Sequence, residues 1–178
     1  IFVDRYDDGT GDFMPSLVLA GNGTPAVVWQ NDSVVYASEE LDLDTRIKSI
    51  EIAAAVFNAE TGTFGESVAL TSENEVCELA VQAAPSGNGV AVCWLENTEN
   101  SLYMASGTNA IHTIAWDAET GTWGEDTLVA EGLTTLANFS AGEIGDAFYV
   151  AYSSDSETST SVSWHNLTAG TTGVLTAA

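Results

Sequence analysis

The sequence predicts an all-β fold of tandem four-stranded antiparallel sheets, and three observations support this prediction. The first is a phrase that occurs twice, as NAETGTFGE at residues 58–66 and as DAETGTWGE at residues 117–125. The copies start 59 residues apart, at 58 and 117, and a fixed period of this size is typical of stacked supersecondary units. The second is a recurrence of short runs rich in Val, Ala, Thr and aromatic residues, separated by turn residues. The third is the lack of sustained helical spacing, so no long amphipathic helix is expected.

Each repeat contains a Gly-rich turn followed by an apolar strand that ends in an aromatic residue. These hairpin segments cover residues 21–29, 87–94 and 145–152, and they close on Trp29, Trp94 and Tyr152. A second apolar segment precedes each copy of the phrase, at residues 50–57 and 111–116. The first of these contains three alanines, but its β-branched residues favour a buried strand over a helix. We expect the closing aromatics to pack between neighbouring sheets, namely Trp29, Trp94, Tyr152, Phe57, Trp116 and Trp164.

The second repeat is the most regular, and we expect its four strands at about residues 78–83, 90–95, 111–116 and 126–130. A fainter third copy runs through residues 160–170, with the same order of strand, aromatic residue and Gly/Thr turn. Approximate repeats at 13–72, 77–131 and 136–178 therefore make up a single all-β module. Because the chain begins without Met or a signal peptide, we expect a fragment of a longer polypeptide. A β-sandwich or a β-solenoid of the same sheets is the alternative architecture.

The repeated phrase is similar to a known turn motif. Asp117, Gly121, Thr122 and Trp123 keep the order Asp, Gly, Thr, Trp of the Asp-box, although the spacing around the glycine differs. In these residues and in its strand pattern, the chain resembles the Asp-box β-propellers of the sialidase type. The resemblance implies about three propeller-like blades. In that family the motif lies away from the active site, so it implies no catalysis.

The resemblance also implies a structural role for the turn residues. An acidic or amide side chain would bond the local backbone, a glycine would supply a positive φ, and an aromatic would pack between sheets. The residues that match are Asn58, Gly62 and Phe64 in the first copy and Asp117, Gly121 and Trp123 in the second. Because propellers have four or more blades, three blades would leave their end sheets exposed or form part of a ring that a second copy completes.

The charge balance excludes some partners. The chain has 3 Lys and Arg against 26 Asp and Glu, for a net charge of −23, and its cations are Arg5, Arg46 and Lys48. Nucleic acids and anionic membranes are bound through Lys and Arg, so we expect neither as a partner. Two arginines also cannot rebuild the arginine cluster with which sialidases hold their substrate. The acidic surface is consistent with solubility, with adaptation to high salt or with calcium binding.

The amino-terminal segment is the candidate calcium site. DRYDDGTGD at residues 4–12 offers the carboxylates of Asp4, Asp7, Asp8 and Asp12, which are the oxygen ligands that calcium prefers. The alternative is an ordinary solvated turn. No other cofactor is expected.

No catalytic residue is assigned, and we expect the chain not to be an enzyme. His112 and His165 occupy repeat-related places, which favours repeat structure over a shared site, and no nucleophile, phosphate-loop or metalloprotease motif occurs. Tyr36 and Tyr103 lie in similar segments of two apparent insertions, 31–48 and 96–110. A sugar ring could stack on either tyrosine, because ligand-binding residues often lie on such loops. Alternatively, these segments only extend the hairpins.

Cys77 and Cys93 are the two cysteines. Folding the second hairpin about residues 86–89 places Cys93 opposite about residue 82, so the cysteines are not expected to be direct cross-strand neighbours. Together these features favour a non-catalytic binding or spacer module of an extracellular or cell-surface protein, with a glycan or a protein as ligand. The alternatives are part of a glycoside hydrolase whose catalytic residues lie elsewhere, and a self-assembling structural subunit.

Overall fold

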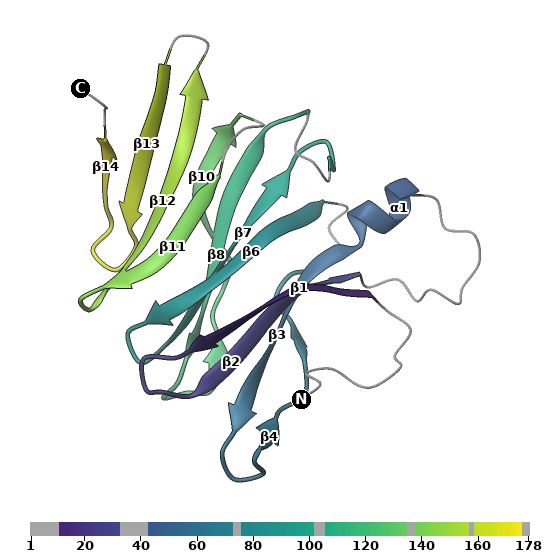
Figure 1. Cartoon of the computed structure of the whole chain (residues 1–178), viewed down its shortest axis with the longest axis vertical. Helices are drawn as coiled ribbons and strands as arrows, with labels where there is room; N and C mark the ends of the chain where they lie inside the picture. The colour runs from purple at the N-terminus through teal and green to yellow at the C-terminus, as the bar shows by residue number, and fades with distance from the viewer. Residues whose placement is uncertain are drawn as a thin grey trace.

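The chain folds into three antiparallel sheets that follow one another in chain order (Figure 1). The computed structural model describes residues 11–32, 43–72, 76–101, 106–134, 138–156 and 159–175. Within these residues each sheet is open and none closes into a barrel. The predicted all-β fold of tandem sheets is confirmed.

The first sheet contains five strands in the order β1-β2-β3-β4, with β5 also paired to β3. An irregularity interrupts the pairing of β1 with β2 between Phe13 and Ser16. One short helix, α1, precedes β3 and lies in the first predicted insertion. The elements are β1 (Gly11–Leu19), β2 (Pro25–Asp32), α1 (Leu43–Lys48), β3 (Ile50–Asn58), β4 (Thr63–Phe64) and β5 (Val68–Ala69).

The second and third sheets repeat this meander. The second has the order β10-β8-β7-β6 with β9 beside β8, and the third has the order β11-β12-β13-β14. The four strands predicted for the second repeat correspond to β6, β7, β8 and β10, each extended by the structure at one or both ends. The elements are β6 (Cys77–Ser86), β7 (Gly89–Asn97), β8 (Asn109–Asp117), β9 (Thr122–Trp123), β10 (Thr127–Leu133), β11 (Phe139–Ile144), β12 (Ala147–Ser156), β13 (Ser159–Asn166) and β14 (Thr171–Leu175).

Two apolar layers join the three sheets. Between the first and second sheets, Ile52 and Ala54 belong to the same buried cluster as Val92 and Trp94. Between the second and third sheets, Leu95 and Ile111 cluster with Val150 and Tyr152. Each large side chain buried in this way contributes about 1.5–3 kcal/mol by its removal from water, so these layers hold the stack together.

In the second and third repeats, the aromatic that closes the second strand points toward the preceding sheet. Trp94 packs in the layer with the first sheet, and Tyr152 packs in the layer with the second. Trp29 is also buried, but on the face of the first sheet that lies away from the second, with Val27 and Phe64. For Trp29, Phe57 and Trp164 the prediction of packing between sheets is therefore wrong. Phe57 alternates onto the same outer face as Trp29 and pairs with Phe64. Trp164 lies opposite Ala151, which alternates with inward-facing Val150 and Tyr152, so it projects from the other face of the third sheet.

The hairpin turns of the first two sheets touch through their backbones. The amide of Gly21 donates to the Gly89 carbonyl at 3.0 Å, and the amide of Asn22 donates to the Asn88 carbonyl at 3.0 Å. A Cβ on Gly21 would lie 1.7 Å from the carbonyl oxygen of Gly87, so a side chain at this position cannot fit without a shift. Glutamines make further bridges between sheets, since Gln82 of β6 donates to the Phe139 carbonyl of β11 at 2.8 Å.

Both cysteines are buried and free. Gln82 lies opposite Cys93, as the hairpin prediction required, and Cys77 lies opposite Asn97. Burial raises the pKa of each thiol from 9.0 to about 12, and the carboxylates of Glu78 and Glu51 add to the effect at Cys77. Among the described residues, no helix has the length and apolar character needed to cross a membrane.

Candidate functional site

The two copies of the repeated phrase form similar corners after β3 and after β8. In the first corner, Oδ1 of Asn58 accepts from the amide of Glu60 at 2.8 Å, and the amide of Gly62 donates to the Asn58 carbonyl at 2.9 Å. Gly62 has a φ of +69°, which glycine adopts at no steric cost. The hydroxyls of Thr61 and Thr63 lie 2.9 Å apart across the turn.

The second corner has the same bonds. Oδ1 of Asp117 accepts from the amide of Glu119 at 2.7 Å, and the amide of Gly121 donates to the Asp117 carbonyl at 2.8 Å. Gly121 has a φ of +71°, and the hydroxyls of Thr120 and Thr122 are 2.9 Å apart. In both corners, the side chain of the first residue, Asn58 or Asp117, therefore orders the turn that follows it.

An aromatic pair closes each corner. Phe57 of β3 lies opposite Phe64 of β4, with ring centroids 5.6 Å apart in an edge-to-face arrangement. Trp116 of β8 lies opposite Trp123 of β9 in the corresponding pair. Phe64 packs on the buried cluster of the first sheet, whereas Trp123 packs on the layer between the first and second sheets.

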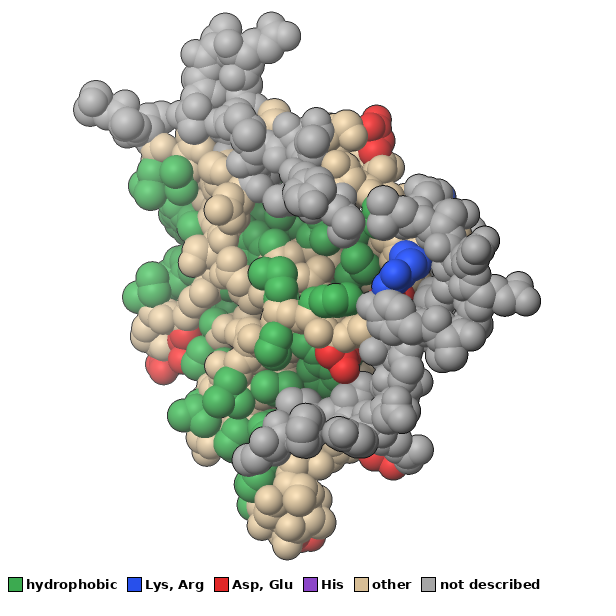
Figure 2. Space-filling model, turned by 45° about the vertical axis from the view of Figure 1, so that its right-hand side comes forward, with side chains coloured by type: hydrophobic (Ala, Val, Ile, Leu, Met, Phe, Trp, Pro, Cys, Tyr) green, Lys and Arg blue, Asp and Glu red, His purple; other side chains and the backbone are tan. Residues whose placement is uncertain are grey.

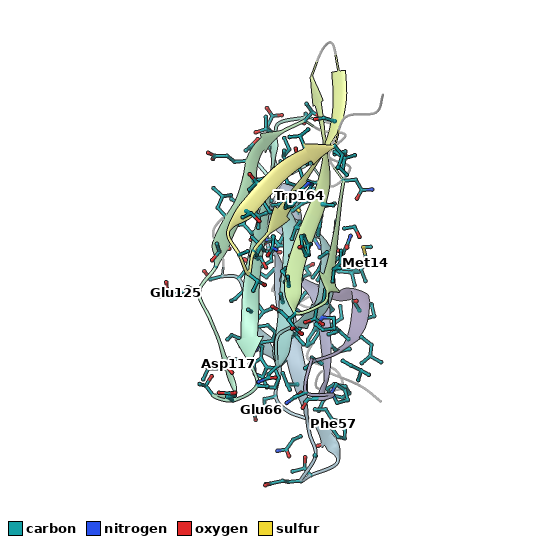
Figure 3. All side chains as sticks on the ribbon, turned by 90° about the vertical axis from the view of Figure 1, so that its left-hand side faces the viewer. Met14, Phe57, Glu66, Asp117, Glu125 and Trp164 are labelled. Carbon is teal, nitrogen blue, oxygen red and sulfur yellow. The ribbon has the colours of Figure 1, made fainter. Side chains whose placement is uncertain are left out.

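A groove of about 760 Å³ lies between the two corners, and we call it the corner groove. Residues of β3 and its turn form one part of the groove, and Trp116, Ala118, Gly121 and Trp123 form another. Asn22 and Thr24 of the first hairpin also line it. Phe57, Glu66 and Asp117 are found at the same end of the molecule in Figure 3.

The corner groove combines aromatic and oxygen-bearing side chains. Trp116 is buried, Trp123 is half-buried, and Asn58, Glu60 and Glu66 are exposed. None of its lining residues is a Lys, Arg or His. The groove can therefore offer indole surface and hydrogen-bond acceptors, and it disfavours an anionic ligand.

The corresponding groove between the second and third sheets provides an internal comparison. It is lined by Gly124 and Glu125, which correspond to Gly65 and Glu66 of the corner groove. Leu167, whose amide donates to the Phe148 carbonyl of β12, takes the place that Trp116 has in the corner groove. This groove measures about 250 Å³ and contains no tryptophan. Its one aromatic lining residue is Phe148, so the indole surface distinguishes the corner groove from the second groove.

A charged group of three side chains lies on the second sheet. Nδ1 of His112 is 2.8 Å from Oδ2 of Asp126, and Nε2 is 3.3 Å from Oε2 of Glu96. The imidazole stacks on Trp94, with centroids 5.8 Å apart and an interplanar angle of 25°. Each ring nitrogen of His112 therefore lies beside a carboxylate oxygen.

Glu96, His112 and Asp126 are also potential metal ligands, since one ligand atom from each lies within 4.8 Å of the others. One imidazole with two carboxylates is a donor set that suits divalent transition metals. His165 has a different neighbour, because its Nε2 lies 3.4 Å from the hydroxyl of Tyr152.

Several predicted site residues lie outside the described residues, namely Tyr36, Tyr103, Asp4, Asp7 and Asp8. Asp12, the fourth predicted calcium ligand, lies within the residues that the structure describes. Its Oδ1 accepts from Nε1 of Trp29 at 2.6 Å and from Nδ2 of Asn31 at 3.1 Å. This oxygen therefore has a structural role between β1 and β2.

Two buried polar groups were missed by the sequence prediction. Asn97 orders the base of the second insertion: its Oδ1 accepts from the amides of Glu99 and Ser101, and its Nδ2 donates to Asn109 at 2.8 Å. Asp32 is buried at the end of β2, where it accepts from Ser49 at 2.7 Å and from Arg46 at 3.3 Å. Local spacing did not predict their burial, because Asn109, Arg46 and Ser49 come from distant parts of the chain.

Neither a family model nor a curated protein matches the sequence. Among solved structures, the chain is similar to part of TcdA4 from Morganella morganii, determined by cryo-EM, with a TM-score of 0.47 and 7% sequence identity. The similarity covers 93% of this chain and 8% of TcdA4, so the chain spans a small part of that protein's length.

Proposed function

We propose that this chain is a non-catalytic binding module of an extracellular or cell-surface protein, and that its corner groove takes an uncharged glycan. The observation that carries the proposal is the half-buried indole of Trp123, which packs beside the buried Trp116 in a groove that also presents Asn58, Glu60 and Glu66. Sugar rings have apolar C–H faces that stack on indole, and their hydroxyls donate to carboxylate and amide oxygens.

The charge of the chain supports an uncharged ligand. With a net charge of −23 and no cation in the groove lining, a sulfated or carboxylated glycan would be repelled. A neutral glycan can instead use the acidic side chains as acceptors. The predicted tyrosines Tyr36 and Tyr103 would be additional contacts for the same class of ligand on the insertions.

The test uses a glycan array followed by calorimetric titration with cellohexaose, xylohexaose, chitohexaose and mannohexaose. We expect at least one neutral glycan to bind, and Trp123→Ala to weaken that binding at least about tenfold, or about 1.4 kcal/mol. The indole of Trp123 is half-buried, so its emission should change on titration.

The matched control is Trp164→Ala, which removes a partly buried tryptophan of the third sheet that does not line the corner groove. This variant should keep the wild-type affinity. An array without any neutral ligand would leave only the spacer role, and equal losses in both variants would exclude the corner groove as the binding site.

A further inference from the structure

The second sheet carries an imidazole between two carboxylates that come from neighbouring strands. His112 belongs to β8, Glu96 belongs to β7, and Asp126 directly precedes β10. Because β8 lies between β7 and β10 in the sheet, His112 is the central member, and we call these three residues the imidazole group. Trp94 is opposite His112 in the pairing of β7 with β8, and Glu96 alternates onto the same face as Trp94.

Asp126 orients one nitrogen of the imidazole. Nδ1 of His112 is 2.8 Å from Oδ2 and 3.0 Å from Oδ1 of Asp126, so both carboxylate oxygens face this nitrogen. An ionised carboxylate only accepts hydrogen bonds, so it favours the neutral tautomer that carries its proton on Nδ1. In that tautomer the lone pair of Nε2 is available for a metal ion. The same contact between a carboxylate and the second ring nitrogen orients the histidines of many metal sites.

The other nitrogen of the imidazole faces Glu96. Nε2 of His112 is 3.3 Å from Oε2 of Glu96. This separation is longer than that of an ordinary N–H···O hydrogen bond, which is about 2.7–3.2 Å. Two ligand atoms that each bind zinc at about 2.0–2.1 Å, with a tetrahedral angle between them, are about 3.3 Å apart. The distance between Nε2 and Oε2 therefore fits one edge of a tetrahedral zinc site.

Packing holds the imidazole in place, and the group remains accessible to solvent. The ring stacks on Trp94, whose side chain is completely buried, so the indole gives the imidazole a fixed support. The side chains of His112, Glu96 and Asp126 are 14%, 21% and 45% exposed. Leu128, which lies opposite His112 on β10, is 49% exposed, so this part of the sheet face is open. An ion can therefore reach the group from solvent, and water can complete its coordination.

The distribution of charge favours a cation at the imidazole group. The sequence has no Lys or Arg after Lys48, so neither the second nor the third sheet contains one. Among the described residues on the face that Figure 2 shows, Lys and Arg side chains appear only on the right-hand side, whereas Asp and Glu side chains are spread over the face. The carboxylates of Glu96 and Asp126 beside a neutral imidazole carry two negative charges, which one divalent ion neutralises.

We propose that the imidazole group binds one divalent transition metal ion, with zinc as the representative. Nε2 of His112 and a carboxylate oxygen of Glu96 coordinate the ion, water fills its other positions, and Asp126 is a positioning residue that acts through Nδ1. Imidazole suits zinc, copper and nickel, whereas calcium and magnesium prefer oxygen ligands, so the histidine sets the selectivity. The bound ion links β7 to β8 and, through Asp126, to the edge strand β10, whose pairing with β8 is irregular. It therefore stabilises the second sheet.

The test is calorimetric titration of the whole chain with zinc chloride at about pH 7.5, in about 0.2 M NaCl and about 5 mM MgCl₂. Magnesium competes for sites made of carboxylates alone, so the zinc signal reports a site with a nitrogen ligand. The variants are His112→Gln, Glu96→Gln and Asp126→Asn. The matched controls are His165→Gln, which removes the other histidine of the chain, and Glu125→Gln, which removes the carboxylate next to Asp126. Circular dichroism verifies that each variant is folded.

We expect one zinc ion per chain with a dissociation constant below about 0.1 mM, and a melting temperature that rises with the zinc concentration. His112→Gln and Glu96→Gln should each weaken binding at least about tenfold, and Asp126→Asn should weaken it about tenfold through the loss of the charged partner of Nδ1. Both controls should keep the wild-type affinity. A wild type that does not bind zinc, or a His112→Gln variant that binds it as well as the wild type, would overturn the proposal.

Nitrogen-15 NMR of the imidazole rings gives a readout that a merely structural role would not change. The chain has two histidines, so comparison with His165→Gln assigns the signals of His112. We expect a proton on Nδ1 alone, a shift of the Nε2 signal when zinc is added, and a weaker preference for the Nδ1 proton in Asp126→Asn. A ring that keeps protons on both nitrogens in the presence of zinc would identify an ion pair with the two carboxylates and would overturn the proposal.

Discussion

Asn58 and Asp117 differ in charge but have the same role in their corners. Each uses one side-chain oxygen to accept from an amide two residues further along, at 2.8 Å and 2.7 Å. What the corner requires at this position is therefore an acceptor oxygen and not a negative charge. Short side chains of this type order turns because the oxygen reaches the backbone without help from another element.

The buried thiols give a prediction at the scale of single residues. The pKa of Cys77 and of Cys93 is about 12 in the fold and about 9 when the chain is unfolded. Between about pH 9 and pH 12, the unfolded chain therefore loses thiol protons that the folded chain keeps. The contribution of the neutral thiols to the free energy of unfolding is therefore fully present below pH 9, and it is lost as the pH rises toward 12.

Two measurements check the thiol prediction. Iodoacetamide at pH 8 should modify the folded chain at least about a hundredfold more slowly than the chain in urea, because only the thiolate reacts. Urea melts of the wild type should lose stability between pH 9 and pH 11 faster than melts of the Cys77→Ala/Cys93→Ala variant. Rapid labelling without urea, or parallel pH profiles, would show that the thiols are not protected.

Strands could be predicted from the sequence because alternation and turn residues are local. The four strands of the second repeat and the pairing of Cys93 with Gln82 were both obtained in this way. Alternation could not show that Trp164 lies on an uncovered face, because it identifies residues that share a face and not what packs on it. The corner groove was missed for a similar reason: Glu66 and Trp123 come from different sheets, and only the packing of those sheets places them on one groove.

The contact between hairpin turns gives a prediction at the scale of elements. Gly21→Ala would place a Cβ 1.7 Å from the Gly87 carbonyl oxygen, so the first and second sheets must separate locally. We expect a loss of about 1–3 kcal/mol in the free energy of unfolding, measured by urea denaturation. The matched control is Gly142→Ala, since a Cβ there meets nothing within 4 Å. A Gly21→Ala variant as stable as this control would contradict the packing of the turns.

The charge of the whole molecule gives a prediction about salt. Twenty-six acidic residues against three cations produce strong self-repulsion in the compact state. Because salt screens this repulsion, the melting temperature should rise by several degrees between about 0.05 M and 1 M NaCl, as measured by differential scanning calorimetry. A melting temperature that stays constant or falls would mean that the carboxylates are spaced too widely to repel.

Calcium chloride at matched ionic strength separates screening from specific binding. A bound ion stabilises the fold by mass action, beyond the effect of sodium at the same ionic strength. An additional shift that is removed by chelator would support the predicted ligands Asp4, Asp7, Asp8 and Asp12, and equal shifts in both salts would argue against them.

The contact of Gly21 with the second hairpin bears on how further units could be recognised. Where these two turns touch through bare backbone, main-chain atoms set the distance between the two hairpins, so any side chain added at Gly21 would widen it. A further layer that joined through this same backbone contact would need a residue without a Cβ at this place, whereas the corresponding Gly87 at the second joint meets nothing within 4 Å. A glycine at the tip of the hairpin is therefore a diagnostic mark for units that share this joint.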